Sequence, residues 1–236
     1  MGIGVLSFPG SAAGGASSGT SDRSVTITPG INDLLVVFCA VSVNTNAAPT
    51  CSDDQGGTYD LIATALYDTS LNIMSCFVRK QLVTAAVAHV ITAATGSNTS
   101  GELHAIQVAG MSRLGSKAVV QSMIQENQAF STTPAPTGNV VNGANAVLGA
   151  IGNKSQPAGL SPTTSGGTFV ELQDTSEAQP ALGLETQGIT GGFTSATVTW
   201  GSVSNTRFAA IVIELDASSA KKSLFLRQAV NRAATY

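Results

Sequence analysis

Residues 30–37 read Gly-Ile-Asn-Asp-Leu-Leu-Val-Val, and residues 143–150 read Gly-Ala-Asn-Ala-Val-Leu-Gly-Ala. Each block is an apolar run introduced by glycine and asparagine, and a polar loop that contains proline follows it. Both loops lead into a Gly-Gly-Thr-aromatic segment, at residues 56–59 and at residues 166–169. The order of features after the first block is therefore repeated after the second.

The correspondence continues along the chain. Residues 71–74 match 181–184, and residues 105–108 match 210–213. The offset falls from 113 through 110 to 105, as expected when loops change length and strands persist. A period near 110 residues is too long for a solenoid repeat. We therefore interpret the chain as two related halves, the alternative being a chance likeness between strands rich in valine and threonine.

The pattern between these blocks predicts an all-β protein. Short runs rich in β-branched residues alternate with Gly, Asn, Ser and Pro, without an amphipathic helix pattern between them. Leu34–Val43 is almost wholly apolar, which indicates a central strand buried on both faces. Arg207–Leu215 alternates, with Ala209, Ile211, Ile213 and Leu215 on one face. The sequence thus predicts a jelly-roll-type β-sandwich built from two related halves. The expected strands are Ser24–Thr28, Leu34–Val43, Thr58–Ala65, Leu71–Lys80, Val87–Ala93, Glu102–Ala109, Ala118–Glu126, Ala146–Gly152, Thr168–Asp174, Ala181–Gln187, Thr194–Trp200 and Arg207–Leu215.

Composition changes at both ends of the chain. Residues 1–22 are expected to form an extended, flexible N-terminal arm, because residues 10–22 are rich in Gly, Ala and Ser. Residues 23–216 are expected to form the sandwich, with halves at about 23–127 and 140–216. Residues 217–236 are expected to form a short C-terminal arm that contains good helix formers.

Charge separates the C-terminal arm from the rest. Charged residues make up 11% of the chain, less than half of the roughly 25% usual in soluble domains. A neutral polar surface suits packing against neighbours, because each buried ion costs several kcal/mol to desolvate. Residues 1–216 carry seven basic and fourteen acidic side chains, whereas residues 217–236 carry four basic and no acidic ones. The arm is either a frayed basic tail or a docking segment. In the second case the partner-binding residues are Lys221, Lys222, Leu224, Phe225, Leu226, Arg227, Val230 and Arg232.

The remaining sequence offers little chemistry. His89 and His104 lie in expected strands, and Glu102 shares a face with His104, but a third ligand is missing, so a structural role is favoured over a metal site. Residues 53–57 read Asp-Asp-Gln-Gly-Gly, which fits a turn better than a Ca²⁺ loop, because the second copy keeps the glycines without the acids. No nucleophile elbow, phosphate loop or zinc motif occurs. We expect no enzyme activity, cofactor, metal or catalytic residue.

Other sequence features bear on the cellular compartment and on the possible partners of the chain. The three cysteines, Cys39, Cys51 and Cys76, are an odd number without metal-ligand spacing, which favours reduced thiols in a cytoplasm. No apolar run of about 20 residues is present, and the first residues lack the basic and apolar regions of a signal peptide. The acidic body argues against nucleic-acid binding. Neither membrane nor nucleic acid is expected as a partner.

Four segments carry a further signal: Asn32-Asp33-Leu34-Leu35-Val36-Val37, the Gly-Gly-Thr-Tyr hairpin, Glu102-Leu103-His104-Ala105-Ile106 and Arg207-Phe208-Ala209-Ala210-Ile211-Val212. Together they resemble the jelly-roll structural proteins of tailed bacteriophage virions. This likeness covers roughly residues 24–216 and consists of strand texture and order, so no functional residue can be transferred.

The resemblance implies a virion protein made in the host cytoplasm. Its partners would be other capsid or tail subunits and copies of itself. A capsid decoration or cement protein is the first expectation, and a tail or fibre component the second. The remaining alternative is a carbohydrate-binding module that stacks sugars on Trp200, Tyr59 or Tyr67, although Trp200 fits a core position better.

Overall fold

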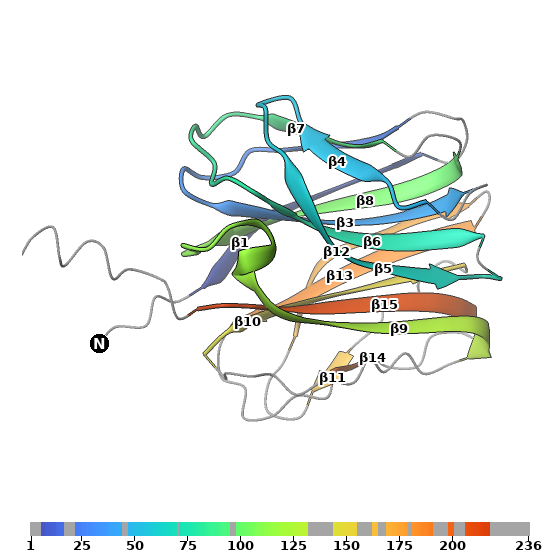
Figure 1. Cartoon of the computed structure of the whole chain (residues 1–236). Helices are drawn as coiled ribbons and strands as arrows, with labels where there is room; N and C mark the ends of the chain where they lie inside the picture. The colour runs from blue at the N-terminus through green and yellow to red at the C-terminus, as the bar shows by residue number, and fades with distance from the viewer. Residues whose placement is uncertain are drawn as a thin grey trace, which may run out of the picture.

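The computed structural model describes residues 6–16, 22–43, 47–69, 71–94, 98–131, 144–154, 162–164, 169–178, 181–190, 198–200 and 206–217. Within these ranges the chain forms antiparallel strands, together with one turn of 3-10 helix, η1, at Gly115–Ala118 (Figure 1). The sheets stack on one another, so the predicted all-β sandwich is confirmed.

The first half of the chain contributes a large sheet and a small one. In spatial order, the large sheet contains β1 (Ser7–Ala16), β8 (Asn98–Ala109), β3 (Leu34–Val43), β6 (Asn72–Arg79) and β5 (Tyr59–Tyr67). The small sheet, which covers the outer face of the large one, contains β2 (Arg23–Ile27), β7 (His89–Ala94) and β4 (Thr50–Asp53).

The second half repeats this plan. Its large sheet contains β9 (Val119–Ser131), β15 (Thr206–Leu215), β10 (Ala146–Asn153), β13 (Ala181–Thr190) and β12 (Val170–Ala178). Its small sheet pairs β11 (Pro162–Thr164) with β14 (Val198–Trp200). In Figure 1 this small sheet lies below the second large sheet, on the side away from the first half. The order β9-β15-β10-β13-β12 matches β1-β8-β3-β6-β5 strand for strand. The two halves therefore have the same strand order, as expected of related halves.

Strand register corrects the sequence alignment by one residue. Leu34 pairs with Val108 in the first large sheet, and Ala146 pairs with Leu215 in the second. All four side chains belong to the core between the two large sheets. Leu34 therefore corresponds to Ala146, at an offset of 112, whereas the sequence match placed Val147 opposite it. Side chains alternate between the faces of a strand, so an alignment that is wrong by one residue exchanges the two faces.

Two expected boundaries also differ from the observed strands. The sequence predicts a flexible arm over residues 1–22, but Ser7–Ala16 forms edge strand β1, paired with β8. Its glycines fit this position, because a Cβ at Gly14 would clash with the backbone of Ser24. The first half was expected to end near residue 127, but Val119–Ser131 pairs in the second large sheet. The halves therefore divide between β8 and β9, across the connection that contains η1.

The main core lies between the large sheets. Inward-facing side chains of β3 and β10 meet there, among them Leu34, Phe38 and Leu148. Each large sheet has a further apolar cluster on its outer face, and in the first half this cluster includes Val25 and Ile91 of the small sheet. Leu34–Val41 is buried throughout, so the expected burial of β3 on both faces is confirmed. Full burial of each leucine, valine or phenylalanine in this stretch stabilises the fold by about 1.5–3 kcal/mol.

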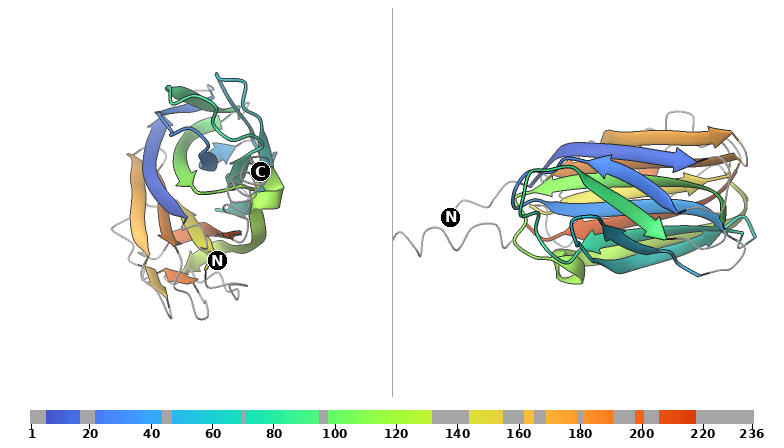
Figure 2. Two further views of the ribbon diagram at one scale, coloured as in Figure 1. Left: turned by 90° about the vertical axis from the view of Figure 1, so that its left-hand side faces the viewer. Right: turned by 90° about the horizontal axis from the view of Figure 1, so that it is seen from above.

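The open edges of the large sheets meet along two seams. On one side, β5 runs beside β9: Ser116 N–H donates to Asp60, and Leu66 N–H donates to Glu126 at 2.7 Å. On the other side, β1 runs beside β12: Ser11 donates to the carbonyl of Leu172 at 2.9 Å. Viewed from the end of the sandwich, η1 and β12 lie on opposite sides (Figure 2).

Candidate interaction site

The residues proposed from the sequence as a docking segment lie outside the described residues. They are Lys221, Lys222, Leu224, Phe225, Leu226, Arg227, Val230 and Arg232. The described chain ends at Ala217, immediately before this segment. Ala217 is buried, and its N–H donates to Asn145 Oδ1 at 2.9 Å. The C-terminal segment therefore starts at the end of the sandwich where β10 begins.

His104 and Glu102 are buried between the halves. His104 Nε2 lies 2.6 Å from the hydroxyl of Thr175 on β12, and Nδ1 lies 3.2 Å from that of Thr186 on β13. Burial lowers the pKa of His104 to about 3. The neutral imidazole therefore links the two large sheets through hydrogen bonds to two hydroxyls. Among the described residues, no group of three His, Cys, Asp or Glu side chains is placed to hold a metal ion.

The Asp53–Gly57 segment forms a turn around a buried carboxylate. Asp53 Oδ1 accepts hydrogen bonds from the N–H groups of Gln55 and Gly57, and its Oδ2 accepts from Arg79 Nε at 2.8 Å and from Tyr59 OH at 3.0 Å. Burial opposes ionisation of Asp53, but these bonds hold the pKa of its carboxyl below its usual range. Asp53 thus braces β4 against β5 and β6, and the turn interpretation is supported.

The aromatic residues considered for sugar stacking are largely internal. Tyr59 bonds to Asp53, and Tyr67 is fully buried in the core between the large sheets. Trp200 ends β14, opposite Pro162, but its side chain lies outside the described part. Neither tyrosine is available to a sugar ring at the surface, which weakens the carbohydrate-binding alternative.

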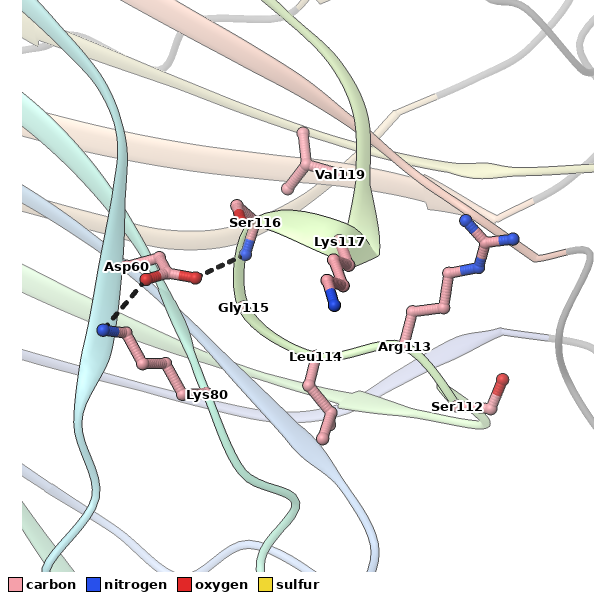
Figure 3. Close-up of a pocket in the computed structure, with 9 residues that line it drawn as sticks. All are labelled: Asp60, Lys80, Ser112, Arg113, Leu114, Gly115, Ser116, Lys117 and Val119. Carbon is pink, nitrogen blue, oxygen red and sulfur yellow. Dashed lines mark hydrogen bonds and ion pairs between the residues drawn. The ribbon is translucent and has the colours of Figure 1, made fainter.

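An open cavity of about 690 Å³ lies at the connection between the halves (Figure 3). It is formed by the start of β5, the end of β6, the η1 connection and the start of β9. Its lining residues are Asp60, Lys80, Ser112, Arg113, Leu114, Gly115, Ser116, Lys117 and Val119.

Asp60 organises one wall of the cavity. Its Oδ2 accepts the N–H of Ser116 at 2.8 Å, and its Oδ1 lies 3.1 Å from Lys80 Nζ, as the dashed lines in Figure 3 show. The bond from Ser116, followed by the contact with Lys80, lowers the pKa of the Asp60 carboxyl. Gly115 has φ of 53°, and a Cβ there would clash with the same carboxylate. The connection is thus tied to β5 through its backbone.

Arg113 holds the opposite wall. Its Nε lies 3.1 Å from Asp216, and the N–H of Asp216 donates to the carbonyl of Ala118 at 3.0 Å. The side chains of Lys80 and Arg113 remain about half exposed, and Lys117 is exposed. The cavity therefore presents cations to solvent, and one of them, Arg113, contacts Asp216 near the end of the described chain.

Sequence reasoning missed this cavity because its charges come from three separated stretches of chain. Lys80, Arg113 and Lys117 each look like isolated surface residues in the sequence. The available signal was their scarcity: they are three of only seven basic residues before residue 217.

In the described part of the chain, none of the helical structure has the length and apolarity needed to cross a membrane.

Comparison with known proteins gives little guidance. No protein-family model matches the chain, and no curated protein does either. A solved chain of red clover necrotic mosaic virus is 10% identical, with 78% of this chain and 74% of that one covered and a TM-score of 0.25. A cucumber leaf spot virus chain is 11% identical, with 93% of each chain covered and a TM-score of 0.22. The plant receptor-like kinase FER is 8% identical, with 89% of each chain covered and a TM-score of 0.26. Two of these three chains are viral, but TM-scores this low carry no argument about function.

Proposed function

We propose that this chain is a non-enzymatic structural protein of a virus particle, with capsid decoration or cement as its role. The supporting observation is how the fold uses its ionisable groups. Asp53 with Arg79, Asp33 with Gln107, and His104 with two threonines all hold strands or sheets together. Their hydrogen bonds serve the rigidity of two packed sheets. A building block that holds its shape within an assembly needs this property.

Strand order supports the jelly-roll part of the proposal. In the first half, β1, β8, β3 and β6 lie in one sheet, and β2, β7 and β4 lie in the other. Ser52 of β4 also bridges to Thr58, which brings the start of β5 to the edge of the small sheet. Strands β1 to β4 thus alternate between the large and the small sheet, and the chain crosses again from β6 to β7 and from β7 to β8, as in the eight-stranded double-sheet fold of many capsid domains.

The partners we propose are other virion subunits and further copies of this chain, joined within the virion after synthesis in the host cytoplasm. Free thiols at Cys39, Cys51 and Cys76 fit a reducing site of synthesis. The C-terminal segment, with its four basic residues, is proposed as a tether. A tether adds affinity by raising the effective concentration of a second contact. A tail or fibre location is the second choice within the same proposal.

Truncation tests the tether. A variant that ends at Ala217 keeps the bond from this residue to Asn145, so the sandwich is expected to stay folded. We expect this variant to melt as the full chain does and to be lost from particles that incorporate the full chain. Normal incorporation would remove the tether from the proposal. Saturable binding to a glycan array would favour the carbohydrate-binding alternative instead.

A further inference from the structure

The basic side chains of the sandwich are distributed unevenly. Three of the seven before residue 217 line the cavity at η1: Lys80, Arg113 and Lys117. The other four are engaged inside the fold or on a single carboxylate. Arg23 and Arg79 are buried, and Lys154 and Arg207 both bind Asp68. Lys154 is also about half exposed, so three of the four exposed basic side chains in the described part line this cavity.

Edge strand β12 carries the opposite charge. It contains Glu171, Asp174 and Glu177, and Asp174 pairs in register with Glu185 of β13. Residues 170–190 include no Lys or Arg. Glu171 and Asp174 are exposed. Burial, followed by the charge of Glu171, raises the pKa of Asp174.

The two charged regions lie on opposite sides of the sandwich. The cavity lies where β5 and β9, edge strands of the two large sheets, run side by side. The acidic strand β12 is the opposite edge of the second large sheet, next to β1. In the end view of Figure 2, η1 and β12 face away from each other. One molecule therefore cannot bring them together, but two molecules can.

We propose that the cavity of one copy receives the acidic β12 edge of a second copy, so that copies associate head to tail. Lys80 contacts Asp60, and Arg113 contacts Asp216. Each of these cations has further N–H donors that can bind carboxylates of the neighbouring copy. Two different surfaces form this contact, so it is heterologous and generates a ring or a row of subunits. The inference deepens the proposed function, on which it rests, by naming a partner and the surfaces used.

The acidic strand fits the cavity better than a nucleic acid does. A phosphate backbone needs many cations, but the cavity has three, and Asp60 in its lining and Asp216 on Arg113 offset part of their charge. The few carboxylates of one strand match this small number of cations. Exposed ion pairs contribute at most about 1 kcal/mol each and are screened by salt. We therefore expect weak, salt-sensitive association in solution that becomes strong when a particle raises the local concentration.

Two charge-reversed variants of the full chain test the contact. The cavity variant is Lys80→Glu with Lys117→Glu, and the edge variant is Glu171→Lys with Asp174→Lys. Each variant alone presents two regions of like charge, so each should associate at least about tenfold more weakly than the native chain at about 50 mM salt. An equimolar mixture restores opposite charges at every contact and should recover association. Sedimentation velocity gives the size distribution, and melting curves check that each variant is folded.

The control is Thr26→Glu with Thr84→Glu, which adds negative charge at exposed positions outside both regions. It should associate as the native chain does. Net charge alone predicts that the edge variant, at formal charge +1 instead of −3, associates more readily; the proposed contact predicts the reverse. A native chain that stays monomeric at high concentration and low salt, or a mixture that stays monomeric, would overturn the contact. Binding of duplex DNA that the cavity variant loses would assign the cavity to phosphate instead. Incorporation of the native chain into particles is measured separately and decides the proposed function whatever these variants do.

Discussion

The two halves share one strand order but stabilise corresponding positions with different chemistry. In the first half, the residue after Gly-Gly-Thr is Tyr59, which pairs with Arg79 on β6, and both bond to the buried carboxylate of Asp53. In the second half, the corresponding residue is Phe169, and Ile189 occupies the position of Arg79. Phe169 and Ile189 belong to an apolar cluster.

The difference shows which part of the architecture depends on particular side chains. The ion pair of Asp53 with Arg79 and the apolar pair of Phe169 with Ile189 support the same strand order, because either can fill the space on the outer face of its sheet. Breaking a buried ion pair is costly, whereas replacing all of it by apolar residues is often neutral. Each change below therefore breaks a feature of one half or gives it the form found in the other.

The largest effect is expected at Asp53. Asp53→Ala leaves Arg79 buried without its carboxylate, so the free energy of unfolding should fall by about 3–5 kcal/mol. The triple variant Asp53→Ala, Tyr59→Phe and Arg79→Ile gives the first half the apolar pair of the second. It should recover most of the loss in urea unfolding. A triple variant as unstable as Asp53→Ala would show that the two solutions cannot be exchanged.

The second prediction concerns two hydrogen bonds at corresponding positions of the two halves. Gln107 donates to Asp33 in the first half, and Asn145 donates to Glu214 at 2.6 Å in the second. Gln107→Glu should cost about 2–3 kcal/mol, because it sets two carboxylates against each other. Adding Asp33→Asn reproduces the arrangement of the second half and should restore stability. A double-mutant cycle measured by chemical denaturation gives the coupling, and additive losses would contradict the equivalence.

The third prediction concerns how the stability of the fold depends on pH through His104, which links the two halves. The pKa of His104 is about 3 in the folded chain and ordinarily 6.5. Below pH 6.5 the unfolded chain binds a proton that the folded chain does not, so stability falls as pH decreases from 6.5 to about 3. At pH 5 the loss from this residue is about 2 kcal/mol. His104→Gln should remove this slope while keeping partners for Thr175 and Thr186. An unchanged slope in unfolding experiments across pH 4–7 would assign the effect to other groups.

The smallest effect is expected at Gly56, whose φ is 75° in the Asp53 turn. A Cβ there meets no other atom, so Gly56→Ala costs only backbone strain, about 1 kcal/mol. Gly57→Ala should cost more, because its Cβ would clash with Asp53 and Arg79. Equal melting temperatures for the two variants would contradict the close packing of this turn.

Sequence patterns were sufficient for strands that carry their own apolar signal. Leu34–Val43 was predicted with its observed bounds, and each of the other expected strands overlaps an observed one. The missed strands lack an apolar signal of their own, because β4 and β11 are short and β1 is rich in Gly and Ala; they form because neighbouring strands pair with them. The one-residue error in the repeat alignment arose because residue similarity ignores which face a side chain occupies.

The candidate site followed from the sequence only in part. Clustering of Lys80, Arg113 and Lys117 depends on the packing of β5, β6 and η1, which charge counting along the chain does not reveal. The acidic character of β12 was visible in the sequence, but its position at the opposite edge was not. Both observations needed the sheet order.

The most direct test of a structural role is to follow the chain through purification of the particles made by its source. Density-gradient fractions probed by quantitative mass spectrometry give its ratio to the major coat protein. We expect the chain to co-sediment with intact particles at a fixed ratio. Recovery of all of the chain at the top of the gradient, free of particles, would contradict the proposed function.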